Sequence, residues 1–340
     1  MAHSIGVKLG GALITLFIAS VAVFIILRLL PADPARLILG PLASAAAIQH
    51  ERIALSLNQP IYVQYFQYLA GFVHGNWGFD YANGTPVLQE VITRLPASLE
   101  LGFYAMLVAV VGAIVAAVAS VGARSSVVDS ITRGVAFIGL GSPPFWIGLM
   151  ALVLFAEYLH WLPGPVGRLS VGVAPPPAIT HFYTWDALLS GQGGTFVNAL
   201  EHLILPAITL ALAPFGYLFR LLRHSLLEVS DEDFLLVCQG KGLTRWQALM
   251  RHGVPNALLP ALTALGLLVA QLVAGSVLVE AVFNWPGVGQ LVVNSVLARE
   301  YGVVEAFVIL SALAFIVVNL VVDALYVVID PRLRRPSILG

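Results

Sequence analysis

The residue types that most often carry catalysis or bind metals are sparse in this sequence. Its eight histidines form no His-x-x-x-His or His-Glu-x-x-His pair, and Cys238 is the single cysteine, so a metal site within the chain is disfavoured. Gly139 to Ser142 reads Gly-Leu-Gly-Ser, but no histidine lies deep in another apolar segment to activate the Ser142 hydroxyl. The phosphate-cradling pattern Gly-x-x-x-x-Gly-Lys-Ser/Thr is also absent. We therefore expect a chain that is not an enzyme and holds no cofactor.

One polar segment instead has the spacing of a docking element. Ser230 with Asp233, and Thr244 with Gln247, each have the three-residue separation of a helix capping box. Gly242, between the two pairs, can adopt the positive φ that ends a helix. This pattern predicts a helix–glycine–helix elbow of roughly 25 residues that projects from the rest of the chain. An ordinary amphipathic loop is the alternative interpretation.

The composition indicates the class of protein that carries this elbow. Of the 340 residues, 59% are hydrophobic and only 10% are charged, against roughly 25% in a typical soluble domain, and the mean hydropathy is +0.90. A net charge of −1 leaves no basic stripe for nucleic acid. We therefore expect an all-α integral membrane protein. Six apolar stretches are long enough to cross a bilayer as helices, at about 9–30, 98–121, 132–159, 202–222, 257–281 and 304–328.

The distribution of lysine and arginine predicts the orientation of these six spans. If the N-terminus is cytoplasmic, most basic residues lie on the inside, although the outside segments are together about twice as long. Both termini and the elbow are then cytoplasmic. The inside residues are Lys8, Arg124, Arg133, Arg220, Arg223, Lys241, Arg245, Arg251, Arg332, Arg334 and Arg335; the outside residues are Arg36, Arg52, Arg94, Arg168 and Arg299.

Two acidic residues lie inside the expected spans, where charge is expensive. Glu280 lies near the outer end of the fifth span and directly precedes a rigid turn containing Trp285, Pro286 and Gly287. Either a structural contact near an outer gate or a role in a translocation path fits Glu280. Asp323, near the inner end of the sixth span, is better interpreted as a helix-packing residue.

The elbow resembles the EAA loop of ABC-transporter permeases. Gly242 takes the glycine position of that loop and Val254-Pro255 the Leu-Pro position, while residues 236–238 replace Glu-Ala-Ala. This weak form is usual in the branch that transports dipeptides, oligopeptides and nickel. Five further segments are similar to that branch in the correct order, at 30–34, 94–99, 142–146, 283–289 and 330–334. The long loop before the fourth span is most like that of the B-type subunit of dipeptide permeases.

The resemblance implies a type I importer of the bacterial inner membrane. Two homologous permease subunits would form the pathway, two cytoplasmic ATPases would bind ATP and Mg, and a periplasmic or lipid-anchored binding protein would deliver dipeptides or oligopeptides. Nickel chelates, haem and opines are alternative cargoes. The implied ATPase-coupling residues are Asp233, Phe234, Lys241, Gly242, Leu243, Arg245 and Pro255, and the gate or pathway candidates are Glu280, Trp285, Pro286 and Gly287.

The expected organisation is a first transmembrane helix with a long periplasmic segment, residues 1–96, followed by a five-helix core, residues 97–335. The coupling loop occupies about 223–256 of that core. A secondary transporter or channel without ATPases is the alternative from a different class. It predicts inverted repeats and broken helices with charge near the membrane midplane, and the sequence shows no repeat and almost no such charge.

Overall fold

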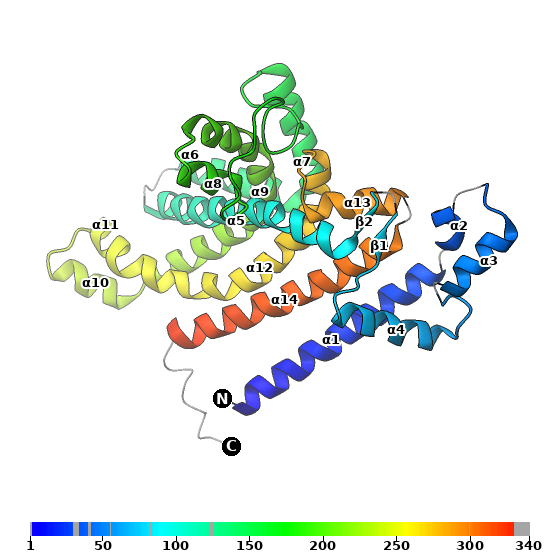
Figure 1. Cartoon of the computed structure of the whole chain (residues 1–340). Helices are drawn as coiled ribbons and strands as arrows, with labels where there is room; N and C mark the ends of the chain where they lie inside the picture. The colour runs from blue at the N-terminus through cyan, green and yellow to red at the C-terminus, as the bar shows by residue number, and fades with distance from the viewer. Residues whose placement is uncertain are drawn as a thin grey trace. The chain divides into compact units, whose positions relative to one another are not determined.

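The computed structural model describes residues 2–29, 34–39, 42–54, 56–81, 83–122, 126–298 and 300–329, and most of these residues are helical (Figure 1). The chain divides into two compact units. One comprises Met1–Leu95 and Leu291–Ile316, and the other comprises Pro96–Gln290 and Val317–Gly340. The expected motif at 330–334 and most of that at 30–34 lie outside the described residues, as do Arg124, Arg299, Arg332, Arg334 and Arg335.

The first unit contains one long helix, several short helices and one small hairpin. Its elements are α1 (Ala2–Leu29), α2 (Pro34–Leu39), α3 (Ala45–Ala54), α4 (Ile61–Val73), β1 (Phe79–Asp80), β2 (Thr85–Pro86), the start of α5 (Val87–Gly122), most of α13 (Val288–Ala298) and the first part of α14 (Tyr301–Ile329). The antiparallel strands pair Phe79 with Pro86 and Asp80 with Thr85. The Asp80 carboxylate accepts hydrogen bonds from the backbone and side chain of Asn83, which favours the turn. This hairpin is a small correction to the all-α expectation.

Aromatic residues hold the first unit together. Phe24 of α1 packs against Tyr65 and Tyr68 of α4, and the Ser20 and Tyr65 hydroxyls share a 2.7 Å hydrogen bond. Phe72 and Trp77 stack with ring centroids 4.4 Å apart. Such contacts add stabilisation beyond the burial of apolar area. They fix the shorter helix α4 on the long apolar helix α1.

The second unit is built around one long helix, α9. Its elements are the rest of α5, then α6 (Ser126–Gly141), α7 (Pro144–Ala151), η1 (Leu152–Tyr158), α8 (Tyr183–Leu189), α9 (Gly193–Ser230), α10 (Asp233–Gly240), α11 (Arg245–Ala248), η2 (Leu249–Gly253), α12 (Val254–Val282), the start of α13 and the last part of α14. Helices α6, α7, α8 and α12 all pack against α9. α9 is therefore the element that positions the others.

Small residues allow helices in this unit to approach closely. Ala97, Ala105 and Ala113 are fully or almost fully buried along one face of α5. Where α6 meets α9, a Cβ on Gly216 would lie 2.6 Å from the Ala136 carbonyl oxygen, and a Cβ on Gly139 would overlap the Leu212 carbonyl. Glycine at a crossing lets two backbones touch. Gly139 in the Gly-Leu-Gly-Ser sequence thus has a packing function.

The expected third span, 132–159, is not one straight helix. Its two helical segments, Val127–Gly141 and Pro144–Tyr158, meet at an angle of 117°. The break falls at Ser142-Pro143-Pro144, because proline cannot donate the helical hydrogen bond and disfavours helix in the residue before it. Among the described residues, α5 and α9 are long and apolar enough to cross a membrane singly, and this bent pair could form a third span. The six-span topology stays a prediction.

Candidate functional site

The predicted elbow exists and is built by local capping. α10 ends at Gly240 in a Schellman motif: the Leu243 N–H donates to the Cys238 carbonyl at 3.3 Å, and the Gly242 N–H donates to the Gln239 carbonyl at 2.9 Å. Gly242 has φ of +93°, a conformation that glycine adopts at no steric cost. Thr244 and Gln247 then form both hydrogen bonds of a capping box at the start of α11. We use the name elbow for residues 233–253, which span α10, α11 and η2.

The first capping box was predicted wrongly. α9 continues to Ser230, whose hydroxyl donates to the Leu226 carbonyl one turn earlier at 2.6 Å. α10 begins after Glu232, which makes no side-chain capping bond. Ser230 lies inside a helix that packs along much of its length, so it bonds backward along α9 rather than capping α10.

The elbow projects at one end of the second unit (Figure 1). Leu235, Ala248 and Leu249 are buried under it, whereas Leu236 is 63% exposed and Trp246 50% exposed. Exposed apolar side chains gathered beside charged ones are typical of protein contact surfaces. Of the predicted coupling residues, Leu243 is half-buried and the others are exposed: Asp233, Phe234, Lys241, Gly242, Arg245 and Pro255.

One side chain of the elbow, Trp246, lies against the end of α5. An added Cβ on Gly122 would lie 3.0 Å from Cε3 of Trp246 and nearer still to Cζ3, so the indole ring covers this glycine directly. With any other residue at position 122, the ring would have to shift from this position. Neither residue was singled out from the sequence, because 124 positions separate them and neither belongs to a local pattern.

Two residues before Gly122, a polar cluster joins three helices. Arg223 of α9 donates to both carboxylate oxygens of Asp129 in α6, at 2.7 and 3.1 Å. Ser120 of α5 donates to the same carboxylate and accepts a 3.1 Å hydrogen bond from Arg223. We call Ser120, Asp129 and Arg223 the three-helix clamp. Bidentate Arg–carboxylate pairs fix geometry as well as adding energy.

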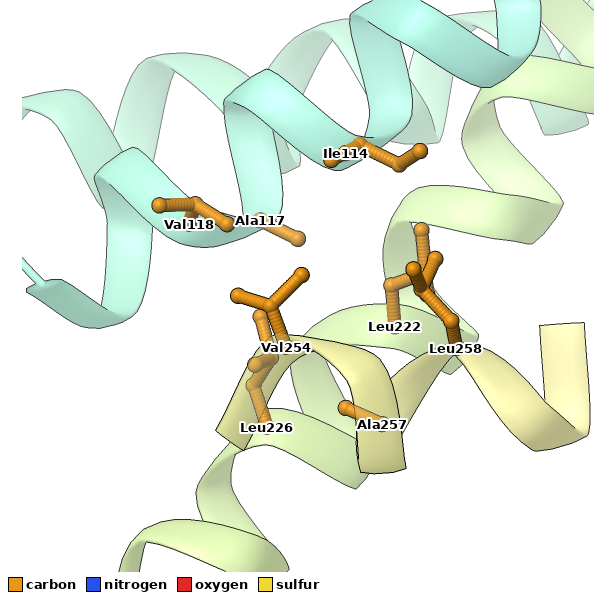
Figure 2. A pocket seen from close by; sticks show the side chains of 8 residues that line it. All are labelled: Ile114, Ala117, Val118, Leu222, Leu226, Val254, Ala257 and Leu258. Carbon is orange, nitrogen blue, oxygen red and sulfur yellow. The ribbon is translucent and has the colours of Figure 1, made fainter. Parts of the chain in front are cut away.

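Nearby, a small gap lies between α5, α9 and the beginning of α12. Figure 2 shows Ile114, Ala117 and Val118 of α5 facing Val254, Ala257 and Leu258 of α12, with Leu222 and Leu226 of α9 beside them. The cavity between them measures ≈ 10 Å³ and is lined only by apolar side chains. It is too small and too apolar for a ligand. It is a packing gap between three helices.

The other end of α12 carries the gate candidates. Glu280 is fully buried, and residues 283–290 wrap around it: its carbonyl accepts the Trp285 N–H at 2.8 Å, and its carboxylate accepts the Gln290 N–H at 3.1 Å. The Trp285 indole, 1% exposed, donates to the Ala97 carbonyl of α5 at 2.9 Å. Gly287 and Gly289 approach the Glu280 carboxylate so closely that a Cβ on either would overlap it. Pro286 is half-buried.

A buried ion pair beside this turn was missed in the sequence. Arg168, from the segment between η1 and α8, pairs with Glu100 of α5 at 2.5 Å and lies over the Tyr183 ring at 3.4 Å. The other Glu100 oxygen accepts the backbone N–H and hydroxyl of Thr184, at 2.9 and 2.6 Å. No short spacing links Glu100 with Arg168, which are 68 positions apart. Together these contacts anchor the segment before α8 to α5.

Asp186 organises the same segment. Its carboxylate accepts hydrogen bonds from the backbone of Ile179, Thr180 and His181 and from the Thr180 hydroxyl. Burial alone would raise the pKa of Asp186, but these hydrogen bonds outweigh burial and hold the pKa below its usual value. Among the described residues, no group of three or more His, Cys, Asp or Glu side chains is placed to hold a metal ion. Asp323 lies in α14, but its side chain is outside the described set.

Comparison with known proteins covers nearly the whole sequence. The chain is 43% identical to the probable D,D-dipeptide transport system permease protein DdpB of Escherichia coli K12, over 95% of both chains. It is 36% identical to the dipeptide transport system permease protein DppB of the same strain, over 96% of this chain and 97% of that protein. It is also 35% identical to the glutathione transport system permease protein GsiC of that strain, over 96% and 97%.

Two family models match consecutive parts of the sequence. Residues 1–102 match the N-terminal part of the binding-protein-dependent transport system membrane component. Residues 109–335 match the binding-protein-dependent transport system inner membrane component. The chain is therefore an integral membrane permease that belongs to the family of binding-protein-dependent transport system inner membrane components.

Proposed function

We propose that this chain is one permease subunit of an ATP-driven importer of short peptides in a bacterial inner membrane, and that its elbow docks a cytoplasmic ATPase. A second, homologous permease subunit completes the pathway, and a periplasmic or lipid-anchored binding protein delivers the peptide. ATP and Mg are bound by the two ATPase subunits. The chain itself contributes the pathway, the gates and the mechanical link.

The geometry of the elbow is the observation that carries this proposal. A Schellman motif and a capping box hold two short helices in a compact projection with exposed apolar and basic side chains. Such a projection can pass on torque, which a flexible tether cannot. A Cβ built on Gly242 points into open space, so the chain itself leaves room there for a partner.

The names of the relatives support peptides as the cargo. The three permeases above are named for D,D-dipeptides, dipeptides and glutathione. These names favour a peptide with two or three residues over a nickel chelate, haem or an opine. Uptake of labelled L,L- and D,D-dipeptides by cells with and without the gene measures the preference directly.

The break between α6 and α7 is of the kind expected in a secondary transporter. Membership of a binding-protein-dependent family nevertheless favours the ATP-driven importer. Affinity purification of the tagged chain from its own membranes separates the two classes. Co-purifying ATPase subunits support the importer, and their absence under conditions that retain the second permease contradicts it.

The coupling role of the elbow is tested by Gly242→Asp beside Gly172→Asp. Both glycines have φ near +90° with open space around an added Cβ, so strain within the chain is matched at roughly 1–2 kcal/mol. We expect only Gly242→Asp to weaken ATPase binding or to uncouple hydrolysis from uptake in reconstituted vesicles. Equal behaviour of the two variants would remove the elbow as a docking surface.

A further inference from the structure

We infer that the contact of Trp246 with Gly122 is the point at which movement of the elbow is passed to α5, and that the three-helix clamp makes α6 and α9 follow. The inference rests on the proposed function, since it requires that an ATPase moves the elbow. Gly122 and Trp246 are thereby positioning residues for transport.

The first step of the argument is the position of Trp246. Its indole lies against Gly122 on one side, yet half of the side chain remains exposed on the elbow. A buried packing residue would be covered on all sides, and a pure docking residue would not require a glycine beneath it. Trp246 therefore bridges the exposed surface of the elbow and the end of α5.

The second step concerns the alternatives for passing movement on. Along the chain, α11 reaches α12 through η2, residues Leu249–Gly253, which has π-helical rather than α-helical hydrogen bonding. Single π-turns are frequent at functional sites, and this one interrupts the regular α-helical hydrogen bonding between α11 and α12. Further along, a small gap separates the first turns of α12 from α5 (Figure 2). At Gly122, by contrast, the indole ring of Trp246 lies directly against the backbone of α5.

The third step is what α5 carries with it. Ser120, one half-turn before Gly122, is bound to both Asp129 of α6 and Arg223 of α9. Arg223 and Asp129 are joined by two hydrogen bonds whose angles are fixed by the planar guanidinium. A displacement of the end of α5 would therefore also displace the adjacent ends of α6 and α9. Tightly packed contacts between helices can turn small shifts at one site into helix movements.

The test uses the complete importer in proteoliposomes, with peptide uptake and ATP hydrolysis measured together. The variants are Trp246→Ala, Gly122→Ala and the combination of Gly122→Ala with Trp246→Leu, which exchanges volume across the contact. Gly134→Ala and Trp161→Ala are the matched controls, because Gly134 has open space around an added Cβ and Trp161 is an exposed tryptophan of the second unit. Trp246→Ala removes a half-exposed side chain, so it tests the contact even where Gly122→Ala fails to fold.

We expect each single variant to keep the ATPases bound but to lower the peptide transported per ATP by at least about fivefold, the low end of coupling between sites. The volume exchange should restore part of that ratio. An unchanged ratio in Trp246→Ala overturns the inference. Loss of the ATPases from Trp246→Ala also overturns it, because Trp246 is then a docking residue, while the proposed function stands. Absence of ATPases from the wild-type complex instead overturns the proposed function.

Discussion

At the scale of single residues, the turn after α12 shows how a gate candidate can also be part of the core. Trp285 is buried in the same apolar cluster as Leu101 and Leu203, and it donates to the Ala97 carbonyl. Glu280 lies at the centre of the turn and is bonded to Gln290. Two glycines are required beside its carboxylate. A role of this turn in the outer gate stays a prediction, and its test must separate gating from folding.

Pro286→Ala makes that separation, and Trp285→Ala does not. Trp285→Ala should destabilise the protein by about 3–5 kcal/mol, because it empties a large buried site and leaves a carbonyl without its donor. Half-buried Pro286 can be replaced with little loss of packing, so Pro286→Ala should keep the melting temperature and lower uptake only if the turn acts in gating. Thermal unfolding and uptake are measured on both variants. Normal uptake by Pro286→Ala would assign the turn a structural role alone.

At the scale of elements, long-range polar contacts decide how segments are placed. The segment between η1 and α8 has little regular structure, yet Glu100 and Arg168 attach it to α5 and Asp186 closes its final turn. Such a buried pair need not add net stability, but losing either partner would leave the other charge buried and unpaired. The three-helix clamp has the same function near the elbow.

Asp186 gives the placement of this segment a dependence on pH. Because its pKa is lowered by folding, the Asp186 carboxylate stabilises the fold above its ordinary pKa of about 4, and this contribution is lost as the pH falls through the lower folded value. Asp186→Asn should therefore cost about 1–3 kcal/mol at pH 7, from lost charge-assisted hydrogen bonds. The difference from wild type should shrink below about pH 4. Melting temperatures between pH 7 and pH 3.5 measure it, and a difference independent of pH would contradict the assignment.

At the scale of the whole molecule, the proposed topology places the elbow in the cytoplasm. The single cysteine, Cys238, lies in α10 and is partly exposed, so the native chain carries its own probe. A membrane-impermeant maleimide should leave Cys238 unlabelled in intact spheroplasts and label it in inside-out vesicles. Bound ATPase should slow that labelling.

A cysteine on the opposite side of the membrane serves as the control for this labelling. Val171, which is 93% exposed in the segment between η1 and α8, is replaced by cysteine in a Cys238→Ser background. Val171→Cys should react in intact spheroplasts, since the proposed topology places this segment outside. Labelling of native Cys238 in spheroplasts at the rate of this control would reverse the orientation.

The sequence alone determined the features that depend on composition or on neighbours within a few positions. Low charge and long apolar runs indicated a membrane protein, as family membership confirms. Gly242 and the Thr244–Gln247 capping box predicted the elbow, because their hydrogen bonds close within three to five residues. Ser230 had the same local spacing and was predicted wrongly, since the packed helix α9 continues through it.

Only the tertiary structure decided which distant residues meet. Arg223 pairs with Asp129, 94 positions away, and Arg168 pairs with Glu100, 68 positions away. Trp246 covers Gly122. Proline at the break near Pro143 interrupts the helix but does not fix the direction in which the chain continues. The 117° angle between the two segments therefore depends on tertiary packing. Each of these contacts pairs residue types that are ordinary in isolation. The crossing of the helices determines which residues meet, and no spacing along the sequence predicts it.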